Sequence, residues 1–368
     1  MTKKDFLNAL VAGLSRAMGT KEMAELRDYY AEQIDDRVEE GLAEEEAVAA
    51  LGDPEELAEQ LIRENGARDT APADARDARI EGDIVRLELD VARADVVLRH
   101  EQLPEGEAAR VKFASKYEWS LTDGTLRIEE RDEEKNFFRR LISLPMEITL
   151  AKNNIEALDA RSLAGDLSLA GIRIRAVTID TRSGDVTLER IDSAEIAVGC
   201  ASGDISAKET AADRVCFKCA SGDITVKDVR AEALQIQSAS GDVELANVSV
   251  DRAALSTSSG DCTVRGLKGR MLRLESASGD IDLSNAAIVD ALEVESASGD
   301  IGLRGVSARQ AQLHTRSGDI EGTFKEARGG YRFEANAQRG EARVPRTEGD
   351  RLVCVETVSG DIHLEVNA

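Results

Sequence analysis

Aromatic side chains make up only 3% of this 368-residue sequence, which argues against a bulky globular core. The hydrophobic residues, 42% of the total, are mostly Ala, Val, Ile and Leu, and these suit thin, regular layers. Long apolar runs are also missing, and a membrane-spanning helix needs about 20 such residues. The N-terminus carries no signal-peptide cleavage pattern. We therefore expect no transmembrane segment and a cytoplasmic protein, with peripheral association to a membrane as the alternative.

Basic residues are fewer than acidic ones: the sequence has 47 Lys and Arg but 71 Asp and Glu, which gives a formal net charge of -24. Such a surface repels nucleic acid and anionic lipid head groups, so no nucleic-acid partner is expected. The acidic excess serves solubility or favours cationic partners.

Cysteine and histidine are few, at five and three residues. Cys216 and Cys219 have the spacing of a CxxC pair, but no second pair and no nearby His follow them. Zinc sites usually need such a complete set. We therefore predict no metal site from these residues, and no cofactor.

Residues 1–66 predict a small helical domain. Thr2 is a candidate N-cap with Asp5 in the capping-box position, and Asp53 precedes Pro54 in the same way at the last helix. A short helix is expected over 43–51. Apolar side chains at helical spacing predict the buried faces of two longer helices: Phe6, Leu7, Leu10, Val11 and Leu14, then Met23, Leu26, Tyr30, Ile34 and Val38.

Part of this domain resembles a known family. The stretch DYYAEQIDDRVEEGLAEEEAVAALGDPEELAEQL, residues 28–61, resembles the HAAS signalling domain through Tyr29-Tyr30, Glu40-Gly41 and Leu51-Gly52-Asp53-Pro54. The resemblance covers about 60 residues and implies a role in bacterial signalling or regulation. Members are usually followed by membrane helices, and no such apolar run follows here. The 17 acidic and 7 basic residues of 1–66 form either a solvated surface or a docking surface for a protein partner. Residues 67–79, rich in Ala, Asp and Arg, predict a linker.

The rest of the sequence is dominated by one phrase, Ser-Gly-Asp, which occurs nine times. Apolar residues recur two and four positions after each glycine and five and seven before it, with a weaker column seven after. This alternation predicts two strands flanking each glycine, and a repeat near 19 residues predicts a solenoid whose stacked coils share a core. The glycines of the repeat are Gly165, Gly184, Gly203, Gly222, Gly241, Gly260, Gly279, Gly299, Gly318, Gly340 and Gly360.

The repeated phrase predicts a corner that each coil must turn. Glycine accepts a left-handed backbone there, and the serine before it is expected to point inward and bond the backbone. A column of small residues three positions before each glycine, including Cys200 and Cys219, should fill the inner corner as buried side chains. The predicted structural corner is Gly184, Gly203, Gly222, Gly241, Gly260, Gly279, Gly299, Gly318 and Gly360.

The aspartate after each glycine is an open case. Stacked carboxylates about one strand spacing apart repel each other unless something compensates. Either each carboxylate accepts backbone N–H bonds at its turn, or the row binds Ca²⁺ between coils. The row is Asp185, Asp204, Asp223, Asp242, Asp261, Asp280, Asp300, Asp319 and Asp361.

The two ends of the solenoid depart from the repeat. Residues 80–150 alternate without its period and predict an N-terminal β cap, with Trp119 and Phe137-Phe138 covering apolar surface. The repeat proper occupies 151–368. The chain stops at Ala368 soon after the last coil, which would leave an uncovered edge and favour end-to-end homo-oligomers.

Residues 80–368, with Ser-Gly-Asp-Ile/Val after alternating strands, resemble the bacterial "putative adhesin" β-strand-repeat family. The resemblance implies a mainly β protein, a right-handed, single-stranded parallel β-helix behind the small helical domain. The sequence shows no Ser/His/Asp set, no phosphate loop and no carboxylate pair distinct from the row. We therefore expect no enzymatic activity but an interaction or regulatory protein linked to bacterial envelope stress or regulation. The alternatives are a self-assembling β-helical filament and a polysaccharide-acting β-helix enzyme.

Overall fold

The computed structural model describes residues 1–15, 27, 30, 31, 34, 37, 38, 42–65, 75–114, 116–130, 145–326 and 329–367, without the side chains of 60–65. Its contacts divide the chain into two compact units, Met1–Asp74 and Ala75–Ala368. Each unit is described by itself. The first is helical, and the second, called the rod below, is made of strands.

The helical unit contains α1 (Lys3–Leu14), α3 (Glu44–Ala49) and α4 (Pro54–Asn65). Thr2 caps α1, since its Oγ1 accepts the N–H of Asp5 at 3.2 Å and donates to the Asp5 carboxylate at 2.7 Å. Asp53 caps α4 through Oδ1, which accepts the N–H groups of Glu55 and Glu56. Both predicted caps are confirmed. No helix in the described ranges is both long and apolar enough to cross a membrane.

The core of this unit contains the predicted stripe of α1, with Phe6, Leu7, Leu10 and Leu14 buried. From the second predicted stripe, Tyr30 and Ile34 are buried, and the Tyr30 ring meets Phe6 edge-on at 6.3 Å. Val38 is 40% exposed, so its predicted burial is wrong. Met23 and Leu26 lie outside the described residues. A Cβ on Gly13 would lie 2.5 Å from that of Ala58, so α1 and α4 pack closely at this glycine.

The rod consists of two sheets. The short-strand sheet has fifteen strands, in spatial order β1 (Ala75–Glu81), β4 (Glu107–Ala114), β7 (Met146–Leu150), β3 (Val96–His100), β9 (Leu167–Ala170), β11 (Val186–Glu189), β13 (Ile205–Lys208), β15 (Ile224–Lys227), β17 (Val243–Ala246), β19 (Cys262–Arg265), β21 (Ile281–Ser284), β23 (Ile301–Val306), β25 (Ile320–Lys325), β29 (Ile362–Asn367) and β27 (Ala342–Arg343).

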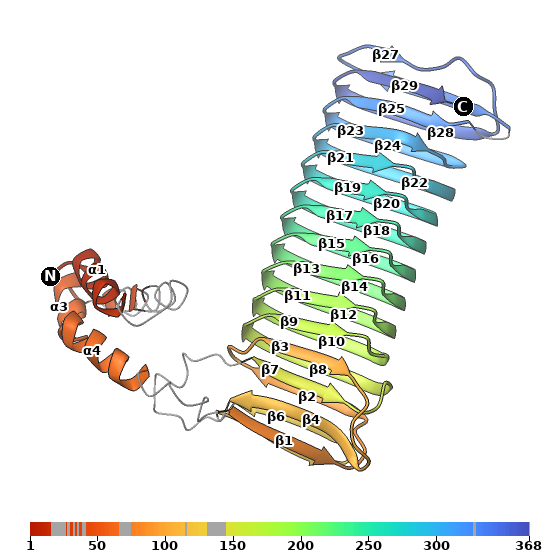
Figure 1. Cartoon of the computed structure of the whole chain (residues 1–368). Helices are drawn as coiled ribbons and strands as arrows, with labels where there is room; N and C mark the ends of the chain where they lie inside the picture. The colour runs from red at the N-terminus through yellow and green to blue at the C-terminus, as the bar shows by residue number, and fades with distance from the viewer. Residues whose placement is uncertain are drawn as a thin grey trace. The chain divides into compact units, whose positions relative to one another are not determined.

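The long-strand sheet has fourteen strands, in spatial order β26 (Tyr331–Ala337), β28 (Arg351–Ser359), β24 (Gln310–Ser317), β22 (Ala287–Ser298), β20 (Lys268–Ser278), β18 (Ser249–Ser259), β16 (Arg230–Ser240), β14 (Ala211–Ser221), β12 (Asp192–Ser202), β10 (Ile174–Ser183), β8 (Ile155–Ala164), β2 (Arg86–Val91), β6 (Thr125–Glu130) and β5 (Tyr117–Thr122). One long and one short strand make each coil, and the coils stack along the rod (Figure 1).

Neighbouring coils pair in parallel and in register, so every column of the sequence becomes a row of identical environments. Val186, Ile205 and Ile224 are successive partners in the short-strand sheet, and all three are buried. The column seven after each glycine is also buried, for example at Ile191 and Val229. These rows form one continuous apolar core. The predicted β-solenoid of about eleven coils with about 19 residues each is confirmed.

Residues 80–150 both continue the rod and close it. Strands β2 and β3 stack in parallel on β8 and β9, so Arg93-Ala94-Asp95-Val96 takes the place of a Ser-Gly-Asp-Val corner. Strands β1, β4 and β5 pair antiparallel and end the stack. Tyr117 of β5 is fully buried, whereas Trp119 in the same strand is 39% exposed. Phe137 and Phe138 lie outside the described residues.

The far end does not stack in sequence order. Strands β28 and β29 lie against β24 and β25, while the earlier strands β26 and β27 form the outermost coil. Side-chain burial explains the exchange, because β28 and β29 bury Val353, Val355, Ile362 and Leu364. Both residues of β27 are exposed and β26 is only partly buried, which suits a terminal coil. The predicted uncovered edge at the chain's last coil is therefore occupied by an earlier segment.

Candidate functional site

The aspartate row is a hydrogen-bonded ladder on the outside of the rod. Oδ1 of each aspartate accepts the backbone N–H of the aspartate in the next coil, as between Asp185 and Asp204 at 2.8 Å. The bonded order is Asp95, Asp166, Asp185, Asp204, Asp223, Asp242, Asp261, Asp280, Asp300, Asp319, Asp361 and then the N–H of Glu341. Each bond thus links two coils instead of closing one turn.

Asp95 and Asp166 belong to the ladder although the sequence analysis left them out. Their signal was present, since Ala94-Asp95-Val96 and Gly165-Asp166-Leu167 keep the aspartate and the apolar residue after it. Within the described ranges, no three acidic, histidine or cysteine side chains converge as metal ligands would. Calcium binding by the ladder stays a prediction.

The corner glycines have a backbone that other residues rarely adopt. In all nine predicted corner positions φ lies between 116° and 151°. A Cβ at Gly222 would lie 2.2 Å from the carbonyl oxygen of Gly203, and the same close contact recurs from coil to coil. Glycine is therefore required twice here, by its backbone angle and by the stacking of the next corner.

The serines before these glycines are exposed, so the prediction that they point inward is wrong. The backbone leaves the strand at this point, and the alternation of the strand no longer applies. The buried column three before the glycine makes the inner bonds instead. Ser276 Oγ donates to the carbonyl of Gly279 at 3.3 Å, and Thr315 Oγ1 donates to that of Gly299 at 3.2 Å.

Cys200 and Cys219 occupy this buried column and are register partners in adjacent strands. Their thiols contact the carbonyl oxygen of Gly203, at 3.5 Å and 3.4 Å. Burial, and next the neighbouring Cys219, raises the pKa of Cys200 to about 11. Both cysteines therefore act as small, protonated core side chains at neutral pH.

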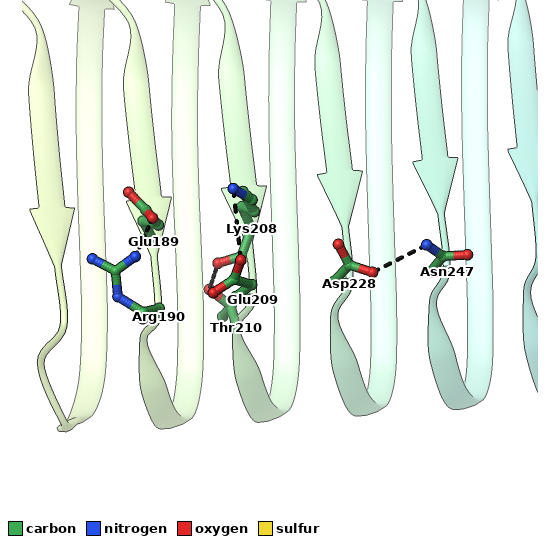
Figure 2. A network of polar contacts seen from close by, with 7 residues as sticks. All are labelled: Glu189, Arg190, Lys208, Glu209, Thr210, Asp228 and Asn247. Atoms are coloured by element: carbon green, nitrogen blue, oxygen red, sulfur yellow. Dashed lines mark hydrogen bonds and ion pairs between the residues drawn. The ribbon is translucent and has the colours of Figure 1, made fainter.

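A second corner, six residues after the first, also has positive φ, and the sequence analysis did not find it. Non-glycine residues occupy it in most coils, with φ between 51° and 55°: Arg190, Glu209, Asp228, Asn247 and Asn285. Figure 2 shows the polar contacts of the first four, in which Asn247 donates to Asp228 Oδ1 at 3.1 Å and Lys208 lies 3.6 Å from Glu209. These groups are exposed, and such ion pairs contribute little to stability. The second corner is a structural feature.

A shallow, open groove of about 740 Å³ lies across the long-strand sheet, over six successive strands from β8 to β18. Its floor consists of the short residues Gly199, Ala201, Ala220 and Ala239, which lie two or four positions before the corner glycines. The buried Cys200 and Cys219 lie beneath them. This groove was not predicted from the sequence, although the short residues at matching positions of neighbouring coils were its signal.

Three cations line the groove, Arg161, Arg182 and Lys218, together with one carboxylate, Asp180. All four side chains are exposed. None of them forms an ion pair or side-chain hydrogen bond within the part of the chain that the structure describes. By contrast, the adjacent Arg214 and Glu195 pair with each other at 3.2 Å. The groove therefore has an unpaired positive excess in a chain of net charge -24.

Two known protein families match the sequence. A family described as Toastrack DUF4097 matches residues 84–213 and 192–365, and the HAAS family matches residues 5–60. No match is found among curated proteins. One similar solved structure is a "putative lipid binding protein" from Parabacteroides distasonis ATCC 8503, at 15% identity over 80% of this chain and 98% of that chain, with a TM-score of 0.39.

Two further solved structures are similar to the chain. A "putative adhesin" from Bacteroides fragilis NCTC 9343 has 12% identity over 79% of this chain and 96% of its own, with a TM-score of 0.32. A "putative adhesin" from Parabacteroides merdae ATCC 43184 has 10% identity over 68% and 97%, with a TM-score of 0.32.

Proposed function

The chain belongs to the Toastrack DUF4097 family, and on this basis we propose that it is a non-enzymatic interaction protein of a bacterial signalling or regulatory system. In this proposal the rod presents a fixed binding surface and the helical unit docks a protein partner. The observation that carries it is the in-register stacking of β8 to β24, which holds outward side chains in straight rows. Long faces of solenoids serve as binding surfaces in this way.

The aspartates of the ladder have a structural role in this proposal. In the ladder one oxygen of each aspartate is bonded to backbone, from Asp95 to Asp361. A general acid or base needs a carboxylate in an environment unlike that of its neighbours. Here the coils give successive aspartates the same environment, which favours a scaffold over a catalytic site.

The helical unit offers a separate docking surface. Val38 and Leu42 are large apolar residues at 40% and 39% exposure. Glu44, Glu45 and Glu46 follow directly in the first turn of α3. Exposed apolar side chains beside acidic ones suit a partner that carries apolar and basic residues.

The cysteines support a reducing compartment and hence the cytoplasm. All five are free, and Cys200, Cys219 and Cys262 are buried in the rod. Proteins of oxidising compartments usually carry disulfides instead.

The ends of the rod favour single rods over filaments. At one end β1 and β5 run antiparallel to their neighbours, so they do not match the parallel coils. At the other end β27 has two residues, both exposed, and short edge strands of this kind discourage pairing. We expect light scattering at high concentration to show monomers. A mass that grows with concentration would support the filament instead.

Affinity capture from the native cell lysate tests the proposed function with three full-length baits: the wild type, the helical-unit variant L42E and the rod variant A220E. Both substitutions are at exposed positions. We expect L42E to lose a specific set of partners and A220E to lose another. If all three baits capture the same proteins at the same levels, neither surface binds and the proposal is wrong.

A further inference from the structure

We propose that the groove over β8 to β18 binds an acidic peptide segment of a partner protein, in extended conformation and across the coils. This inference rests on the proposed function and adds the chemical class of the ligand. In the groove a hollow in the face of the rod coincides with three cations that have no ion pair within the described residues.

Charge complementarity selects an anionic occupant. Arg161, Arg182 and Lys218 give three positive charges, and Asp180 gives one negative charge. In the long-strand sheet Asp180 is the register partner of Arg161 on one side and of Gly199 on the other. No ion pair joins Asp180 to Arg161 within the described residues, so the cations of β8, β10 and β14 remain open to a ligand.

Spacing favours an extended peptide. Arg182 lies in β10 and Lys218 in β14, two coils further along the rod. Two strand spacings amount to about 10 Å along the rod. In polyproline II, an extended conformation with three residues per turn, side chains three residues apart lie on the same face and are separated by about 9 Å. A peptide with acidic residues at every third position would therefore face both cations at once.

The floor of the groove fits a peptide better than a sugar chain. Gly199, Ala201, Ala220 and Ala239 let a backbone approach the sheet, and Gln237, Ser256 and Ser258 offer hydrogen-bonding groups beside it. None of the residues lining the groove is aromatic, although aromatic and apolar side chains usually line the pockets that hold rings. The peptide is thus the occupant that the groove favours over an acidic polysaccharide.

Fluorescence anisotropy with the full-length chain tests the inference. The probe is a fluorescein-labelled peptide of four Glu-Ala-Ser repeats, and the control probe has Gln in place of each Glu. We expect the acidic probe to bind at low salt and to weaken several-fold when the salt concentration is raised. The Gln probe should bind at least about tenfold more weakly, because it lacks the charges.

Three variants locate the binding. R182Q/K218Q should weaken the acidic probe about tenfold or more, while D180N should strengthen it about two- to threefold. K227Q is the matched control, because Lys227 is an exposed lysine at the end of β15, in the other sheet, and its removal should leave the affinity unchanged. Circular dichroism should show the same folded spectrum for all variants.

Three outcomes would overturn the inference: no binding of the acidic probe at low salt, equal binding to R182Q/K218Q, or binding of a labelled oligogalacturonate in its place. The proposed function is judged separately, by whether A220E loses partners in the capture experiment. If A220E loses partners but the acidic probe does not bind, the rod face is a binding surface for a different class of ligand.

Discussion

The backbone N–H of Asp242 donates to Oδ1 of Asp223, one coil away, at 2.8 Å. Asp223 in turn donates its own N–H to Asp204 Oδ1 at 2.8 Å. Each aspartate is thus both acceptor and donor, and the ladder ties the corner of every coil to the next. A short side chain with an acceptor oxygen is what this position needs, whereas its negative charge costs repulsion along the row.

Substitutions at Asp223 separate the acceptor from the charge. Asp223→Asn keeps an acceptor oxygen and removes one negative charge, so the free energy of unfolding should stay the same or rise by a few tenths of a kcal/mol at low salt. Asp223→Ala removes the acceptor for Asp242 N–H and should lower it by about 1 kcal/mol. Denaturant unfolding at low and high salt measures both. Equal stability of the Ala and Asn variants would contradict the bonding role.

The wild type and Asp223→Asn also test calcium binding by the ladder. If the aspartates only bond backbone, millimolar CaCl₂ should change the melting temperature no more than MgCl₂ at the same concentration. A ligand that binds only the folded chain raises its stability with concentration. A rise with Ca²⁺ that is reduced in Asp223→Asn would show an occupied ladder and restore the calcium hypothesis.

Two glycines with positive φ should respond differently to alanine. Gly222 has φ of 131° and a Cβ there would lie 2.2 Å from the Gly203 carbonyl oxygen, so Gly222→Ala should lower the free energy of unfolding by about 2 to 4 kcal/mol. Gly171 has φ of 65° and open space around its Cβ, so Gly171→Ala should cost about 1 kcal/mol. Urea unfolding of the two variants gives the comparison. Equal losses would mean that stacking, as distinct from backbone angle, plays no part at the corner.

The corner of the solenoid was predictable because its sequence repeats. The chain must make the same turn in each coil, so Gly222 and its equivalents recur at nearly constant intervals. The second corner was hidden because the coil imposes positive φ on whatever residue lies there, Arg190 in one coil and Asn247 in another. The residue type varies at the second corner because the backbone there accepts several residue types. The sequence therefore contains no repeated motif that marks this corner.

The order of the last coils and the groove could not be predicted from the repeat. Both coils around Gly340 and Gly360 have apolar residues at alternating positions, and only their relative burial decides which is outermost. The groove depends on the absence of bulk at Gly199 and Ala220 and on the unpaired state of Lys218. Whether a charged side chain forms an ion pair depends on the side chains of the neighbouring coils in three dimensions. The register of a regular repeat shows only which residues lie side by side.

A residue that tolerates the left-handed backbone region should stabilise the chain when it is placed at the second corner. Glu209 has φ of 51°, and asparagine occupies the same position at Asn247 and Asn285. Glu209→Asn should raise the free energy of unfolding by about 0.5 to 1 kcal/mol, since the ion pair with Lys208 is exposed and contributes little. The same exchange at Glu321, which is exposed in β25, is the control and should give no gain. Thermal unfolding of both variants measures the difference, and a loss of stability in Glu209→Asn would contradict the argument.

Thiol reactivity should follow burial. Cys216 and Cys354 are partly exposed, whereas Cys200, Cys219 and Cys262 are buried. Burial raises the pKa of Cys200 to about 11, so its thiolate is scarce at neutral pH. A colorimetric disulfide reagent should therefore modify two thiols quickly in the native protein and the remaining three only after unfolding. Fast modification of all five would show that the coils open readily around the groove floor.

Cys262 should make the stability of the rod depend on alkaline pH. Burial, followed by the nearby Asp261, raises the pKa of this thiol from 9.0 to about 12. Between these values the unfolded chain has lost the proton while the folded chain keeps it, so the unfolded state binds fewer protons and stability falls as pH rises above 9. Cys262→Val is a matched variant, because the register partners of Cys262 are Val243 and Ile281.

The two proteins should therefore have parallel stabilities below pH 9 and diverge above it, by up to about 1.4 kcal/mol for each pH unit, with the wild type the weaker one. Groups that titrate in both proteins cancel in this difference. Urea unfolding at pH 8, 10 and 11 provides the measurement. A difference that stays constant across this range would mean that Cys262 ionises in the folded rod, and hence that its coil admits water.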